Sequence, residues 1–264
     1  MKISARHKLI PAIIMILVAA IAMSTASYAW FTLNNKVEVS SIQLSIVAPT
    51  NMLIREHGNG SFTDIVYVTT NPDGRIMHGS SVDGTAIYTV ENPTVGVDTS
   101  GNINENGVII QSTTPVSDST SGCYIDYVFD VLNTGASNII VGLDKLTITN
   151  TTPSGAAGED ISGAVRFAII EDNVSKGVFA NGETADIEAY LTTTTKAAQT
   201  TLQTSNNLFT LDANGVPDEV EDPFGETTIT VRIWIEGQDA DCRTVNAGTS
   251  FSISFDFYYV SVTP

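Results

Sequence analysis

Thr227–Glu236, TTITVRIWIE, gives the clearest indication of the fold, because its apolar side chains recur at every second position. One face would carry Ile229, Val231, Ile233 and Ile235, and the opposite face Arg232 and Trp234. A period of two is typical of a β-strand that presents one face to a core. The stretch Phe251–Val260, FSISFDFYYV, repeats the pattern, and its inward residues would be Phe251, Ile253, Phe255, Phe257 and Tyr259. Strands of about ten residues are long, so we expect both to be central.

Shorter strands are predicted before these two, because β-branched residues alternate there between clusters of turn residues. They cover residues 51–56, 62–70, 123–133, 139–149 and 164–170. Asn133–Asn138 is predicted to join the third and fourth as an antiparallel hairpin. The last, AVRFAII, is mostly apolar and is expected to be covered on both faces. Many short strands with polar turns predict an all-β fold, an antiparallel two-sheet β-sandwich.

Three parts of the chain are less regular. Residues 71–122 are rich in Gly, Pro, Asn and Ser, which predicts a loop-rich elaboration. Residues 177–191 indicate a hairpin around Asn181–Gly182, with a helix over Ala185–Leu191 as the alternative. Thr192–Asn207 is a run of Thr, Gln and Ala that predicts a surface loop.

The segment Lys36–Val47, KVEVSSIQLSIV, also alternates, but its phase changes at Ser40–Ser41. The apolar residues before and after that step are Val37, Val39, Ile42, Leu44 and Ile46. A slip of one residue turns the side chains to the other face of a sheet unless a bulge absorbs it. The segment is therefore either a strand with a bulge or a strand shared between two partners.

Leu9–Phe31 contains no charged residue, and a basic cluster precedes it. About 20 apolar residues can cross a membrane as a helix, and the positive flank favours a cytoplasmic N-terminus. Ser27-Tyr28-Ala29 has small residues where a signal peptidase cleaves. We therefore expect residues 1–35 to be a signal peptide or a membrane anchor. Residues 36–264 would form an exported domain, outside the cell or on its surface.

The composition narrows the classes of partner and activity. The net charge is −17, and all 29 acidic residues come after position 31. An acidic domain does not suit nucleic acid or anionic lipid. The sequence carries no His-Glu-x-x-His zinc motif, no Gly-x-Ser-x-Gly elbow and no phosphate-binding Gly-rich loop. We therefore expect a protein that is not an enzyme and that needs no cofactor.

Cys123 and Cys242 are the two cysteines of the chain. In an exported protein such a pair indicates one disulfide, which would close a long loop and constrain the unfolded state. The alternative is two separate buried thiols.

An acidic stretch at Asp212–Asp222 is the one candidate for a bound cation. Closely spaced oxygen ligands around a Gly turn suit calcium. The ligands would be Asp212, Asn214, Asp218 and Glu221. A solvated acidic loop is the alternative.

Two motifs together resemble a known group of proteins. They are Ser27–Thr32, SYAWFT, at the end of the export helix, and Val231–Cys242, VRIWIEGQDADC, before the closing aromatic strand. Both are similar to sequences of the TasA/camelysin class of Gram-positive surface and matrix proteins. The resemblance implies a jelly-roll-like sandwich and export through a dedicated signal peptidase. For fibre-forming members it also implies an N-terminal strand that completes the sheet of the next subunit, and residues 37–47 are its place here.

We therefore expect a structural protein of the cell surface or biofilm matrix. Its partners would be other copies of itself, matrix or surface proteins, the export machinery, and the membrane before or instead of cleavage. One alternative is a surface adhesin that binds through the sandwich loops. A second is a pilin-like subunit that keeps its N-terminal helix, although no prepilin cleavage glycine precedes Leu9.

Overall fold

The computed structural model describes Met15 and residues 39–70, 76, 79–88, 122–152, 160–181, 189–192, 195–198, 207–213, 225–237, 239, 242 and 248–262. The chain divides into two compact units, Met1–Asn35 and Lys36–Pro264. In the first unit Met15 is described and is helical, and the rest of the predicted helix lies outside the described residues. Within the described ranges, no helix has the length and apolar character needed to span a membrane.

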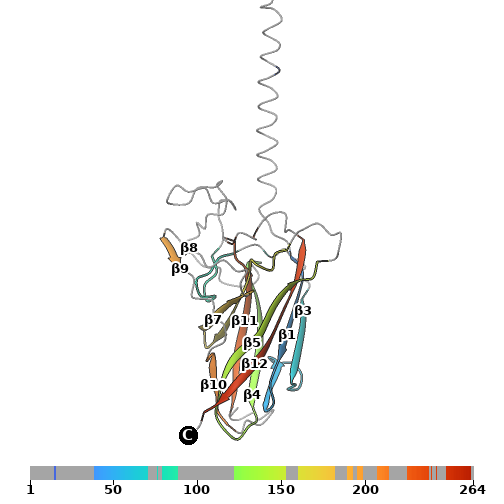
Figure 1. Cartoon of the computed structure of the whole chain (residues 1–264), viewed down its shortest axis with the longest axis vertical. Coiled ribbons are helices and arrows are strands. Elements are labelled where there is room, and N and C mark those ends of the chain that lie inside the picture. The colour runs from blue at the N-terminus through green and yellow to red at the C-terminus, as the bar shows by residue number, and fades with distance from the viewer. Residues whose placement is uncertain are drawn as a thin grey trace, which may run out of the picture. The chain divides into compact units, whose positions relative to one another are not determined.

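The described part of the second unit is built from strands (Figure 1). They are β1 Val39–Val47, β2 Met52–Glu56, β3 Ile65–Thr70, β4 Ile125–Asn133, β5 Ile139–Asn150, β6 Val165–Glu171, β7 Val174–Ala180, β8 Ala189–Thr192, β9 Thr195–Ala198, β10 Phe209–Leu211, β11 Glu226–Ile235 and β12 Thr249–Ser261. The first sheet has the order β10-β5-β12-β1-β3, and the second sheet has the order β2-β4-β11-β6-β7. Most neighbours are antiparallel, and the all-β prediction is confirmed.

The two stretches with the clearest alternation form the middle strand of each sheet, as predicted. β11 is central in the second sheet and β12 in the first. Their inward residues belong to one core that both sheets share. In that core the ring of Phe167 on β6 stacks on the ring of Phe255 on β12, with 5.4 Å between centroids.

β1 lies inside the first sheet, between the last strand and β3. It is parallel to β12 and antiparallel to β3. The register with β12 shifts between Val39 and Ser41, which agrees with the bulged strand, one of the two interpretations that the sequence left open. Beyond it, Ile42, Leu44 and Ile46 point into the core and are at most 1% exposed. Val37 lies outside the described residues.

The predicted hairpin between β4 and β5 is wrong, because the two strands belong to different sheets. The turn after Asn133 instead carries the chain from one sheet to the other. The buried Asn133 fixes this crossing: its amide donates to the carbonyl oxygens of Ser137 and Asp212, and its side-chain oxygen accepts from the Gly135 N–H. A hairpin and a crossing begin with the same turn residues, so the local pattern does not separate them.

Residues 189–198 also differ from the expectation. The helix considered for Ala185–Leu191 is wrong over the described β8, and the loop predicted for Thr192–Asn207 contains β9. β8 and β9 pair antiparallel as a hairpin. Thr192 and Thr195 pair with each other across this hairpin, and β-branched residues favour extended backbone.

A second apolar cluster covers the outer face of the second sheet at one end. Its members are Ile87, Cys123, Tyr124, Ala168, Ile170, Val178 and Trp234. Gly84 packs so closely here that an added Cβ would lie 2.3 Å from the Cβ of Ala168. Its φ of +84° also favours glycine. β6 is therefore covered on both faces, as predicted.

The predicted disulfide is wrong in this structure, where Cys123 and Cys242 are buried and not bonded to each other. Cys123 lies in the outer cluster and Cys242 in the shared core, so the two thiols belong to different apolar clusters. Burial raises the pKa of the Cys242 thiol, and the nearby Glu236 and Asp239 carboxylates raise it further. A thiol with a raised pKa stays protonated and is a poor nucleophile.

We expect alkylation of the purified protein to find two thiols per chain once it is unfolded without a reductant. In the folded protein both should react far more slowly, because they are buried and, for Cys242, protonated. Mass spectrometry after iodoacetamide treatment measures both. Unfolded chains that take up no reagent would contain a disulfide and would contradict the structure.

Candidate functional site

β1 is the candidate assembly element, and its position determines what its removal would do. Without it, β12 and β3 would each lose a hydrogen-bonding neighbour, and the core would lose Ile42, Leu44 and Ile46. An unpaired strand edge in the middle of a sheet is a template for another strand. The sheet therefore requires a strand in this position.

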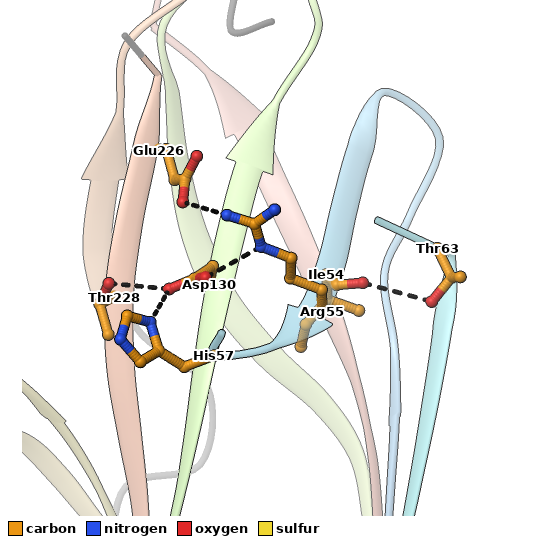
Figure 2. Close-up of polar contacts among 7 residues, drawn as sticks. All are labelled: Ile54, Arg55, His57, Thr63, Asp130, Glu226 and Thr228. Carbon is orange, nitrogen blue, oxygen red and sulfur yellow. Dashed lines mark hydrogen bonds and ion pairs between the residues drawn. The ribbon is translucent and has the colours of Figure 1, made fainter. Parts of the chain in front are cut away.

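A polar cluster on the second sheet is centred on Asp130 of β4, whose side chain is 2% exposed (Figure 2). Arg55 Nε of β2 donates to Asp130 Oδ2 over 2.9 Å, and Thr228 Oγ1 of β11 donates to Oδ1 over 2.9 Å. His57 Nδ1 lies 2.7 Å from the same Oδ1. Arg55 also reaches Glu226 Oε1 at 3.3 Å. The cluster thus joins three neighbouring strands through one carboxylate.

The charge of Asp130 is compensated by these partners. Burial alone would raise its pKa, but the hydrogen bonds from His57, Arg55 and Thr228 outweigh burial and lower the pKa below the ordinary value of 3.8. A buried carboxylate that keeps its charge needs such partners. Asp130 therefore remains an ionised anchor at neutral pH.

The imidazole of His57 is open to solvent, since its side chain is 56% exposed. Its backbone N–H donates to the Val128 carbonyl oxygen over 2.9 Å, which holds the turn after β2 against β4. An Asp–His pair can orient a general base, but catalysis also needs a reacting group on the other ring nitrogen. The contacts found for this pair all hold β2 and its turn in place.

A second cluster fixes the segment at residues 81–88 on the sheet. Arg232 of β11 makes a two-point ion pair with Asp126, at 2.7 and 2.8 Å, and its guanidinium lies 4.2 Å from the centroid of the Tyr124 ring. It also donates to the carbonyl oxygens of Gly84 and Thr85. Arg232, predicted to lie opposite the core face, thus binds an outer segment to the sheet.

The third polar cluster is fully buried. Arg166 of β6 pairs with Asp239 at 2.5 Å, with both side chains at most 1% exposed. Glu236 is also buried, and its Oε2 accepts from Trp234 Nε1 at 3.2 Å and from the Ser81 N–H at 3.3 Å. These bonds fix the turn after β11 in the VRIWIEGQDADC motif. Glu236 and Asp239, the described acidic residues of that motif, therefore serve packing in this structure.

The candidate calcium residues are only partly described. Asp212 comes directly after β10, and its Oδ1 accepts from Asn138 Nδ2 over 2.9 Å. Asn214, Asp218 and Glu221 lie outside the described residues. Within the described ranges, no group of three His, Cys, Asp or Glu side chains could hold a metal ion. Calcium binding by this loop stays a prediction.

Sequence reasoning missed the role of Asp130 and its partners. His57 was visible as a residue of a Gly-rich turn, and Asp130 as a polar residue in a strand. Their pairing depends on β2, β4 and β11 being neighbours in the sheet. The one indication of this cluster in the sequence was that Asp130 is a charged residue in the middle of an apolar strand.

Comparison with known proteins identifies no family: no family model matches the chain, and no curated protein sequence matches it either.

We expect Asp130→Asn to lower the free energy of unfolding at pH 7 by roughly 3 kcal/mol, because it removes the buried negative charge that Arg55, His57 and Thr228 share. The contribution of Asp130 is complete above pH 3.8 and is lost as the pH falls through the lowered pKa of the folded state. The difference in the free energy of unfolding between the parent protein and Asp130→Asn should therefore shrink below about pH 4. Urea unfolding at pH 7, 5 and 3 measures it.

Asp256→Asn is the matched control. Asp256 pairs with Lys145, whose side chain is 72% exposed, and exposed pairs contribute less than about 1 kcal/mol. Equal losses in the two variants, or a difference independent of pH, would contradict the anchoring role of Asp130.

Proposed function

We propose that this chain is exported and acts outside the cell as a non-enzymatic structural protein of the cell surface or a biofilm matrix. In the proposed architecture the two sheets form a jelly-roll-like β-sandwich. The shared core and the stacking of Phe167 on Phe255 across the sheets support this. The apolar stretch at Leu9–Phe31 and the acidic character of the chain beyond it support export.

We further propose that copies assemble by donating β1 to the next subunit. The observation that carries this proposal is that the first strand of the unit is internal to the first sheet, between β12 and β3. In a donated arrangement the same contacts would form between chains, as in domain swapping. The resemblance to the TasA/camelysin class supports the same mode of assembly.

The contacts of β1 favour tight binding, whether the strand inserts into its own sheet or into the sheet of another chain. Three fully buried aliphatic side chains, Ile42, Leu44 and Ile46, each contribute about 1.5 to 3 kcal/mol by leaving water. Backbone hydrogen bonds to two neighbours add specificity for register. The bulge lies between Val39 and Ser41, and the pairing with β12 is continuous from Ser41 to Val47.

Complementation by a peptide tests the proposal. Cleavage after Ser27-Tyr28-Ala29 would make Trp30 the first residue of the mature chain. We expect the chain that begins at Trp30 to form fibres at high concentration, visible by electron microscopy. Deletion of residues 37–47 should abolish fibres and destabilise the domain, because the position between β12 and β3 in the first sheet is then empty. A synthetic peptide of residues 37–47 added to the deletion variant should bind and restore its stability in thermal unfolding.

Adjacent residues of β1 supply a matched pair of variants. Leu44→Asp places a charge in the core. It should therefore prevent both the insertion of β1 between β12 and β3 and the assembly of the chains. Ser45→Asp lies on the outward face of the same strand and should leave both intact. A chain from Trp30 that stays monomeric at high concentration, or a deletion variant that is as stable as the parent, would contradict strand donation.

A further inference from the structure

An open surface pocket of about 440 Å³ lies at the edge of the second sheet. One wall is the outer segment at Asp83 and Thr85, and the other is the start of β7 with the turn before it. The polar residues that line it are Asp83, Thr85, Asn173, Ser175 and Lys176. We call it the Asp83–Ser175 pocket. The structural roles of the three polar clusters described above do not explain why this pocket is present.

The wall formed by the outer segment is held rigidly. Arg232 donates to the carbonyl oxygens of Gly84 and Thr85, at 3.3 and 2.9 Å. The Gly84 N–H donates to Ser81 Oγ over 2.8 Å, and Asp83 Oδ1 accepts from both the N–H and the hydroxyl of Thr85. A wall with this many bonds is preformed, as is usual for binding sites.

The opposite wall contains two local irregularities of the β6–β7 hairpin. Asp172 and Asn173 both have positive φ, of 50° and 62°, which is the pattern of a two-residue type I′ turn. The register then shifts at Lys176, which has no partner on β6 and is the extra residue of a bulge. Bulges redirect side chains and often lie next to functional sites.

Several polar groups of the pocket are not used by the described protein. Asp83 Oδ2 and the Asn173 amide make no hydrogen bond within the described residues. The Ser175 hydroxyl is buried and also has no partner there, so rotating it toward the cavity breaks no bond. Lys176 is paired with Glu171 at 2.8 Å, which offsets its positive charge.

These groups indicate the class of ligand. The described lining has no aromatic ring for stacking and no unpaired cation for phosphate. It offers a carboxylate, an amide and hydroxyls within one small space, a mixture of donors and acceptors that suits vicinal hydroxyl groups. We propose that the Asp83–Ser175 pocket binds a neutral sugar residue of a glycan. This goes beyond the structural role proposed for the chain and does not depend on assembly.

The test uses the chain that begins at Trp30, kept at a concentration below that of any assembly. It is screened against immobilised neutral oligosaccharides of glucose, galactose, mannose and N-acetylglucosamine, and the strongest is titrated by calorimetry. We expect saturable binding. Asn173→Gly should weaken it about tenfold, since it removes one hydrogen-bonding group and glycine accepts the positive φ.

Asp172→Gly is the control, because it changes the other residue of the same turn, which does not line the pocket. It should leave affinity within twofold. Ser175→Ala is a second variant on the strand and should weaken binding in the same way as Asn173→Gly. Absence of saturable binding to every sugar, or equal effects of Asn173→Gly and Asp172→Gly, would overturn the proposal. Both results are independent of fibre formation, which electron microscopy measures separately.

Discussion

The parallel pairing of β1 with β12 is the interaction that holds the first sheet together. It brings the first and last strands of the unit together in the middle of a sheet. Closing the long loop between these two strands has an entropic cost, and contacts between distant strands slow folding. Until β1 is inserted, Leu44 and its aliphatic neighbours on β1 are missing from the core. A strand that fills the gap between β12 and β3 is well suited to be supplied by another chain.

The second sheet is built differently, around charges on its outer face. Asp130 joins β2, β4 and β11, and Arg232 holds the outer segment over β6 and β11. Arg166 and Asp239 fix the turn that comes after β11. Each of these charges has a partner within hydrogen-bond distance, which is the condition under which charges are tolerated away from water. These clusters keep the second sheet and its pocket rigid, independently of β1.

Side-chain periodicity was sufficient to predict the strands but not their neighbours. The alternation in β11 and β12, the bulge near Ser41 and the double coverage of β6 can be inferred from residues close in sequence. The crossing at Asn133 and the separation of Cys123 from Cys242 depend on which sheet each strand joins. The Asp130 cluster and the Asp83–Ser175 pocket combine residues from distant segments. No local pattern carries that information, because it is created by the register of the sheets.

The most direct test of strand donation is a cross-link between two different chains. Ser45 of β1 and Ser254 of β12 are register partners, and neighbouring strands are close enough for a disulfide. One chain would carry Ser45→Cys and the other Ser254→Cys, and the two would be mixed, assembled and oxidised. Strand donation predicts a covalent dimer of the two chains. It predicts no dimer when the second chain carries Val174→Cys on β7 instead of Ser254→Cys. A single chain that carries both substitutions is the control, because it shows whether the Ser45–Ser254 disulfide can form within one chain. If that control forms the disulfide while the assembled mixture contains no cross-link between chains, strand donation is contradicted.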